Sequence, residues 1–291
     1  CMTIRVKTAN YKRFTRSKFG NFMYFFLLAL AGIFTILPLV YSVITSFKPL
    51  DELMIFPPRF YVVRPTLANY TILPELLSDL DVPFLRYLFN TLFLSVVITV
   101  LHVIAASMAS FVMCQYGGKA MKWLFMLVQF ALLYNGTTLG VPQYLIFSKL
   151  HIINTYLVYI LPMIPSAMGV FLIKQYMDSG VPDVLIEAAR IDGASVWRIF
   201  WQLVMPLVKP AWFTLTLFCF REAWAVVPNG TIFTESLKSL PSVLTQITSS
   251  GIARSGSAMA INVLLLIPPT LVYMITQSNV METMSSAGIK D

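Results

Sequence analysis

The longest run of the chain without a formal charge reads YLFNTLFLSVVITVLHVIAASMASFVMCQYGG and occupies residues 87–118, between Arg86 and Lys119. A single α-helix needs about 20 mostly apolar residues to cross the roughly 30 Å hydrocarbon core of a bilayer. This run exceeds that requirement, and it therefore predicts a transmembrane helix with residues 88–113 at its centre.

Five further segments have the same character. Uncharged runs occupy residues 19–47, 123–148, 150–173 and 255–281, and another apolar segment follows Lys209 but contains Arg221 and Glu222. Each is long enough for one membrane-spanning helix. We therefore expect an all-α integral membrane protein with six transmembrane helices, whose cores are residues 22–46, 88–113, 123–140, 156–176, 210–227 and 259–276.

The composition agrees with a membrane protein. Hydrophobic residues make up 57% of the 291 residues and charged residues 12%, whereas soluble domains average about 45–50% and about 25%. The formal charge of +8 does not indicate nucleic acid binding, because basic residues of membrane proteins collect in cytoplasmic loops. Three cysteines and two histidines are too few and too scattered for a metal site or a disulfide framework.

The basic residues predict the orientation. Six spans place both ends on one side, which would carry 13 Lys and Arg residues against 7 on the other. By the positive-inside rule both termini are expected in the cytoplasm. The chain then divides into a cytoplasmic tail (1–21), a first transmembrane helix (22–46), an extracytoplasmic loop (47–87), a permease core (88–276) and a cytoplasmic C-terminal tail (277–291).

Three loops have a recognisable character. Residues 48–83 contain six prolines, which predicts an irregular or short-helical loop. Residues 143–150 are expected to form a short helix at the outer surface. Residues 229–257 are polar and contain several glycines, which indicates a second external loop.

The segment between the fourth and fifth spans predicts two short helices that meet at a glycine. Pro182 and Asp183 favour a helix start, and Gly193 suits the left-handed position after a helix end. Ser195 can cap a second helix that runs toward Pro206. This segment is either an amphipathic helix lying on lipid headgroups or a docking element for another protein.

The charges of the first helix favour docking. A helix that binds headgroups is typically rich in lysine, whereas this one carries Asp183, Glu187 and Asp192. At helical spacing Val184, Leu185 and Ala188 share one side.

At these residues the sequence resembles a known family. Glu187-Ala188-Ala189, followed by Gly193 and Pro206, resembles the EAA loop of ABC-importer permeases. The segments PTLANY (65–70), RYLFNT (86–91), NTY (154–156) and AGIK (287–290) are similar to parts of the smaller six-helix permease of maltose-type carbohydrate importers. One departure is Ala225 after Trp224, where sugar permeases often have asparagine.

The resemblance implies the type I ABC importer permease fold (MetI-like), with an EAA coupling loop at residues 177–209. It implies a permease subunit of an ATP-driven importer that brings a sugar or oligosaccharide into the cytoplasm of a bacterium or archaeon across the plasma membrane. The implied partners are a second homologous permease, an ATPase dimer, an extracellular sugar-binding protein and the lipid bilayer, with no nucleic acid. The chain itself would be no enzyme, with no catalytic residue, metal or cofactor, and Mg-ATP would bind the partner ATPase.

The resemblance also implies two contacts with the ATPase. The EAA loop would couple to it through Val184, Leu185, Glu187, Ala188, Ala189, Asp192, Gly193 and Pro206. The C-terminal tail would contact it through Ala287, Gly288, Ile289 and Lys290.

Polar residues within the spans raise further alternatives. Arg221, Glu222 and Trp224 are candidate pore or partner contacts, because ionisable groups inside a membrane are functional candidates by default. His102 is interpreted as a hydrogen-bonded packing residue.

An ion-gradient-driven secondary transporter is the alternative function, and it would favour intramembrane acids and an internal repeat. A membrane scaffold or sensor is a third alternative, which leaves the EAA spacing unexplained.

Overall fold

The computed structural model describes residues 18–78, 82–133, 139–228, 230–249, 251 and 254–288. In these ranges the regular structure is helical, as the sequence predicts. The elements are α1 (Lys18–Ser46), α2 (Leu50–Leu53), α3 (Ala68–Thr71), α4 (Leu73–Ser78), α5 (Phe84–Gln115), α6 (Lys119–Ala131), α7 (Gly140–Lys149), α8 (Leu157–Met163), α9 (Ala167–Gly180), α10 (Asp183–Ile191), α11 (Val196–Arg198), η2 (Ile199–Val204), α12 (Met205–Leu207), α13 (Lys209–Trp224), η3 (Glu235–Leu237), α14 (Leu240–Ser249) and α15 (Ser255–Gly288).

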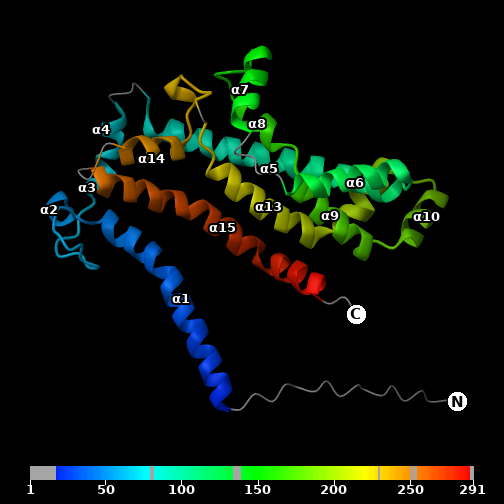
Figure 1. Ribbon diagram of the computed structural model, residues 1–291, viewed down its shortest axis with the longest axis horizontal. Coiled ribbons are helices and arrows are strands. Elements are labelled where there is room, and N and C mark those ends of the chain that lie inside the picture. The colour runs from blue at the N-terminus through cyan, green and yellow to red at the C-terminus, as the bar shows by residue number, and fades with distance from the viewer. Residues whose placement is uncertain are drawn as a thin grey trace.

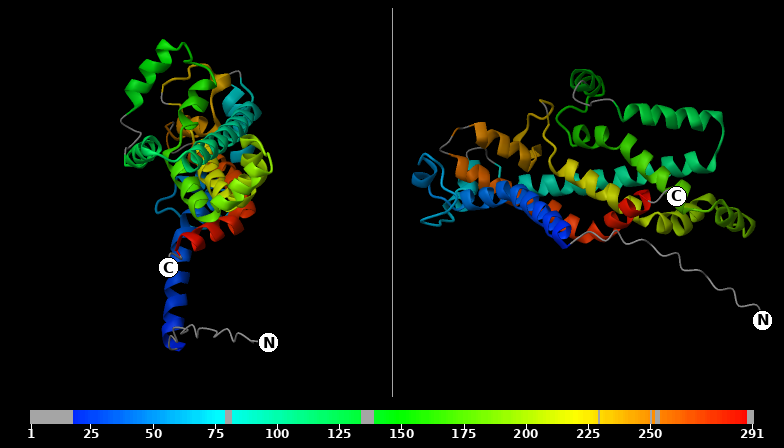
Figure 2. Two further views of the ribbon diagram at one scale, coloured as in Figure 1. Left: turned by 90° about the vertical axis from the view of Figure 1, so that its right-hand side faces the viewer. Right: turned by 60° about the horizontal axis from the view of Figure 1, so that its bottom comes forward.

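The long helices form an elongated bundle. Helix α13 packs between α5 and α15, and α9 packs against α5 (Figure 1). Helix α1 contacts α15 and its N-terminal part diverges from the bundle, as Figure 1 and the left view of Figure 2 show. The short helices α2 to α4 lie at one end of the bundle, and α10 lies at the opposite end.

The apolar segments form membrane-length helices, and two of these are broken. Within the described residues, α1, α5 and α15 are each long and apolar enough to cross a membrane, and there are up to five such spans if each of two bent helix pairs counts as one. The described part of α6 has 13 residues, which corresponds to about 20 Å of helix. The multi-pass, all-helical architecture is thus confirmed, while the count of six stays a prediction.

The fourth predicted span is not one continuous helix. Helices α8 and α9 meet at an angle of 41°, because Pro165 has no backbone N–H and disfavours helical geometry in the residue before it. Ser166 then caps α9 by accepting a hydrogen bond from the N–H of Gly169 at 2.7 Å. The His102 ring contacts the carbonyl of Met163 at this break, at 2.6 Å, which confirms its packing role.

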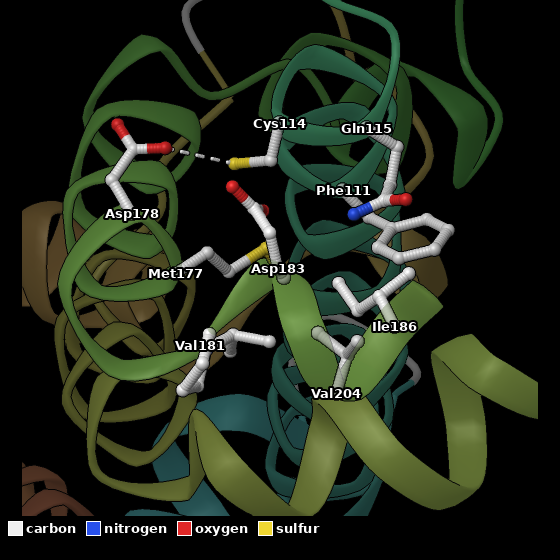
Figure 3. A pocket seen from close by; sticks show the side chains of 10 residues that line it. Phe111, Cys114, Gln115, Met177, Asp178, Val181, Asp183, Ile186 and Val204 are labelled. Carbon is white, nitrogen blue, oxygen red and sulfur yellow. Dashed lines mark hydrogen bonds between the residues drawn. The ribbon is translucent and has the colours of Figure 1, made fainter. Parts of the chain in front are cut away.

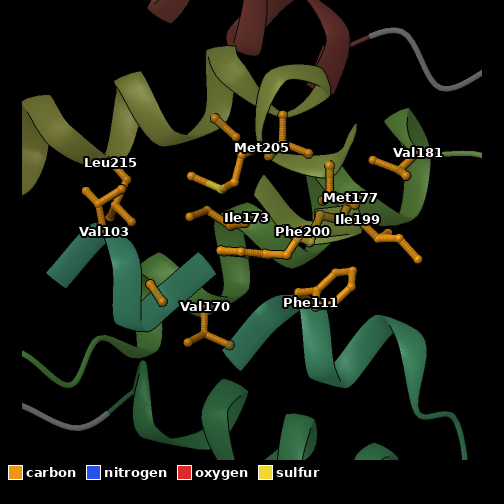
Figure 4. Close-up of a cluster of buried hydrophobic side chains, with 14 of the residues drawn as sticks. Val103, Phe111, Val170, Ile173, Met177, Val181, Ile199, Phe200, Met205 and Leu215 are labelled. Atoms are coloured by element: carbon orange, nitrogen blue, oxygen red, sulfur yellow. The ribbon is translucent and has the colours of Figure 1, made fainter. Parts of the chain in front are cut away.

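Buried hydrophobic side chains form three clusters along the bundle, one of which joins the middle of α5 to α7, α8 and α13. The largest cluster joins α5, α9, η2 and α13 near α10 and includes Val103, Phe111, Ile173, Phe200 and Leu215 (Figure 4). A second cluster at the opposite end joins α5, α14 and α15. By contrast, most of the large apolar side chains of α1 are exposed, as expected of a surface that lipid or another apolar helix covers.

Several hydroxyl side chains inside the bundle are satisfied by nearby carbonyl groups. Thr91, Ser95 and Ser110 donate to the carbonyls four residues earlier in α5, at 2.7–2.8 Å. Ser110 also donates to the carbonyl of Val170 in α9, at 3.0 Å. Such bonds let hydroxyl groups reside in an apolar bundle and join neighbouring helices.

Candidate functional site

The EAA loop (residues 177–209) has the first helix and the glycine turn that the sequence predicts. Helix α10 begins directly after Pro182 and ends at Ile191. The N–H of Gly193 then donates to the carbonyl of Arg190 at 3.0 Å, and the N–H of Ala194 to that of Ala189 at 2.9 Å. This pair of bonds is a Schellman motif, and Gly193 adopts the left-handed φ of 78° that the motif needs.

One face of α10 is anchored to the bundle, and the other is open. Ile186 is 4% exposed and belongs to the cluster of Figure 4, and Ala189 packs against the same cluster. On the opposite face Val184 is 73% exposed and Ile191 is 87% exposed. The structure therefore turns Ala189 inward, whereas the sequence-based interpretation grouped it with the outward residues.

The outward face of α10 carries a carboxylate among apolar side chains. Glu187 and Ala188 are exposed beside Val184, and within the described residues Glu187 takes part in no ion pair. Arg190 instead points to the bundle, where its guanidinium donates to the Gln115 side chain at 2.7 Å. An apolar surface with one free carboxylate is suited to a partner with an apolar groove and a basic group.

The second half of the EAA loop is built into the bundle. The Ser195 hydroxyl accepts a hydrogen bond from the N–H of Arg198 and caps α11. The chain continues as η2, a π-helical segment that the sequence did not predict. Phe200 is buried there, and its ring lies 5.4 Å from that of Phe111 in α5, while Pro206 in α12 is exposed.

A polar cavity separates the base of α10 from α5 and α9. It has a volume of about 420 Å³ and is lined by residues of all three helices (Figure 3). Asp178 lines this cavity, where it accepts a hydrogen bond from the thiol of Cys114 at 3.2 Å and pairs with Lys174 at 2.5 Å. Asp183, the first residue of α10, also lines this cavity, so the base of the helix is less tightly packed than its middle.

The other predicted site residues are dispersed. Arg221 and Glu222 are exposed near the end of α13. Trp224 is buried, and its indole donates to the carbonyl of Leu265 in α15 at 2.9 Å. Ala287 and Gly288 end α15, whereas Ile289 and Lys290 lie outside the described residues. In the described part of the chain no group of three His, Cys, Asp or Glu side chains could hold a metal ion.

Toward the opposite end of the bundle, asparagines hold the loops between the helices. Asn154 accepts hydrogen bonds from the N–H groups of Phe233 and Thr234 at 3.1 and 3.0 Å. Asn90, fully buried in α5, donates to the carbonyls of Ser236 and Lys238 at 2.7 and 3.0 Å. These two bonding sets fix the segment that joins α13 to α14.

A third asparagine fixes the loop that follows α1. Asn69 donates to the carbonyls of Ser46 and Lys48, both at 2.8 Å. Asn69, Asn90 and Asn154 each lie in a segment that carried the family resemblance. Their position in these segments could have indicated a structural role, which the sequence analysis did not assign to them.

Glu52 closes the same loop. Its carboxylate accepts hydrogen bonds from the N–H groups of Val63 and Arg64 at 3.1 and 2.8 Å. The bond from Val63, aided by Arg64 and Lys48 and opposed by partial burial, holds the pKa of Glu52 below its ordinary value.

Comparisons with known proteins agree on one family. The model of the family described as "Binding-protein-dependent transport system inner membrane component" matches residues 88–285. The inner membrane ABC transporter permease protein YcjP of Escherichia coli (strain K12) is 26% identical over 267 residues, which cover 90% of this chain and 94% of YcjP. The arabinooligosaccharides transport system permease protein AraQ of Halalkalibacterium halodurans is 27% identical over 276 residues, with coverage of 90% and 94%.

A solved structure has the same fold. A chain from the crystal structure of a bacterial ABC transporter involved in the import of the acidic polysaccharide alginate superposes with a TM-score of 0.74 and 22% sequence identity. The match covers 90% of this chain and 98% of that chain.

Proposed function

This chain belongs to the family of binding-protein-dependent transport system inner membrane components, and we propose that it is the permease subunit of an ATP-driven importer that brings a sugar or oligosaccharide into the cytoplasm. Family membership confirms the resemblance found in the sequence. The substrate class rests on the names of relatives, among them a permease for arabinooligosaccharides.

The structural observation that carries the proposal is the outward face of α10. It exposes Val184, Ala188 and Ile191 around the free carboxylate of Glu187, at the tip of a segment whose inner face is fixed to the bundle. In this proposal the face enters a groove of the ATPase, and Glu187 pairs with a basic group there. ATP binding favours the closed ATPase dimer, and the EAA loop transmits that preference to the pore.

The proposal requires further partners. A second homologous permease completes the pore, and its surface is a candidate cover for the exposed side of α1. An extracellular binding protein delivers the sugar to the face formed by the external loops. Mg-ATP binds the ATPase dimer, the C-terminal tail contacts that dimer, and both termini lie in the cytoplasm of a bacterium or archaeon.

The alternative, a transporter driven by an ion gradient, finds less support. It needs ionisable groups aimed at one another or at a pathway inside the spans. Arg221 and Glu222 are neighbours in α13 and therefore diverge by about 100° around the helix, and neither shares an ion pair with another described residue. Lys174 and Asp178 of α9 pair with each other, but they lie at the end of that helix, beside α10.

Reconstitution tests the proposal. The chain is co-expressed with its ATPase and second permease, purified in detergent and placed in vesicles. We expect uptake that requires ATP and a sugar-loaded binding protein, and a panel of loaded binding proteins then identifies the sugar. Uptake that follows an ion gradient without ATP, or a chain that retains no ATPase, would refute the proposed function.

A further inference from the structure

The EAA loop joins α13 through a sharp corner. The helical stretch Val196–Leu207 and helix α13 are bent by 82° at a break of one residue, Val208. Val208 is fully buried in the cluster of Figure 4. Along the chain, a displacement of α10 reaches α13 through this corner, here named the elbow (residues 205–212).

Few backbone hydrogen bonds cross the elbow. The N–H of Val208 donates to the carbonyl of Val204 at 3.1 Å, and the N–H of Trp212 donates to the carbonyl of Val208 at 3.3 Å. Pro210, in the first turn of α13, has no N–H to add to them. The π-helical segment η2 precedes the elbow, and such segments accommodate local irregularity within helices. The elbow therefore needs another group to fix its angle.

The indole of Trp212 supplies that group. Its Nε1–H donates to the carbonyl of Met205 at 3.1 Å. Met205 lies before the corner and Trp212 after it, so the bond closes the angle directly. The ring is further fixed by Phe213, whose centroid is 4.2 Å away in a stacked arrangement.

The surroundings leave room for the elbow to relax without this bond. Trp212 and Met205 line an apolar cavity of about 520 Å³ between α5 and the elbow. Because one side of the indole borders this space, the hydrogen bond to Met205 helps to fix the position of the ring. Tight packing on every side would make the bond redundant.

The other bent helix pair uses a related contact. At the break between α8 and α9, the His102 ring binds the carbonyl of Met163 at 2.6 Å. That donor comes from α5 and ties the break to a neighbouring helix. At the elbow the donor belongs to the bent segment itself, so the bond fixes an angle within one segment.

We propose that the indole–carbonyl bond between Trp212 and Met205 keeps the elbow rigid, which makes Trp212 a positioning residue for coupling. This inference rests on the proposed function, because it assigns the elbow to the path between ATPase and pore. With the bond, motion of α10 turns α13. Without it, part of that motion is absorbed at the elbow, and ATP is hydrolysed without transport.

The first test replaces the donor and measures the sugar imported per ATP hydrolysed by the reconstituted complex. Trp212→Phe keeps an aromatic ring and removes the N–H. One net hydrogen bond corresponds to about a fivefold change in a population, so we expect this ratio to fall by up to about fivefold while the ATPase stays bound. An unchanged ratio would overturn the inference and leave the proposed function intact.

One variant controls this test. Trp224→Phe removes an indole bond of similar length, to Leu265, outside the elbow, and it should lower thermal stability but keep the ratio. If Trp212→Phe does not assemble with its partners, the distance measurement on the separately purified chain decides.

A distance measurement tests the elbow without transport. Spin labels are placed at the exposed positions Ile191 in α10 and Phe218 in α13, in the full chain with its native cysteines replaced by serine. We expect Trp212→Phe to broaden the distance distribution and Trp224→Phe to leave it unchanged. Equal widths in all three proteins would refute the inference, even if the complex transported no sugar.

Discussion

Replacement of Glu187 by alanine separates folding from docking. Glu187 is exposed on α10 and takes part in no ion pair within the described residues. Its removal should therefore change the free energy of unfolding by no more than about 0.5 kcal/mol. At an interface, however, the loss of one member of a buried charge pair costs about 2–5 kcal/mol.

The two magnitudes predict different results in two assays. A loss of about 2 kcal/mol raises the dissociation constant for the ATPase about 30-fold, which is enough to lose it during purification. The melting temperature and the co-purification of the second permease should stay normal. The measurements are ATPase retention on the detergent-purified complex and sugar uptake in cells.

A matched control is Asp51→Ala, which also removes an exposed carboxylate but at the other end of the bundle. Asp51 pairs with Arg64 at the surface, and such pairs contribute about 0–1 kcal/mol. Asp51→Ala should retain the ATPase. If Glu187→Ala retains it equally and transports normally, the outward face of α10 is not the docking element.

Three further predictions concern the loops. Gly193→Val forces a β-branched residue into φ 78°, which should cost about 1–3 kcal/mol; a thermal melt measures the loss, and an unchanged melting temperature would contradict the assigned turn. Asn154→Ala leaves the N–H groups of Phe233 and Thr234 without their acceptor, so hydrogen exchange should be faster at these two amides and unaltered in α5. The folded-state pKa of Glu52 is lowered, so the stability that its carboxylate contributes is complete above the ordinary Glu pKa of about 4.3 and is lost as the pH falls through the folded value. Glu52→Gln should therefore make the melting temperature less sensitive to acid. An equal sensitivity in both proteins would exclude this role of Glu52.

Local patterns predicted the features that depend on neighbouring residues. The turn at Gly193 and the cap at Ser195 follow from conformational preference and side-chain chemistry within a few residues. The short helices α2 to α4 in the proline-rich loop were likewise expected. The break at Pro165 was not expected, since the apolar character of residues 156–176 continues across this proline.

The segment between α13 and α15 was harder to predict. Residues 240–249 form α14, whose Leu240, Val243 and Ile247 are buried against α5 and α15. In the sequence they lie in a polar, glycine-containing stretch, so only the neighbouring helices show which side chains are covered. The hydrogen bonds of Asn90 and Asn154 join residues that are about 80 to 150 positions apart. No local sequence pattern predicts contacts over such a separation.

The sequence alone determined that this chain crosses a membrane several times and where its EAA loop begins and turns, because hydrophobic length and turn chemistry are local properties. Tertiary structure decided which face of α10 is free. Ile186 and Ala189 are covered only because α5, α9 and η2 converge on them, and Val184 and Ile191 remain open because no described element reaches them. It also decided the elbow, since an indole can close an angle of 82° only after packing has brought Trp212 and Met205 to opposite sides of one corner.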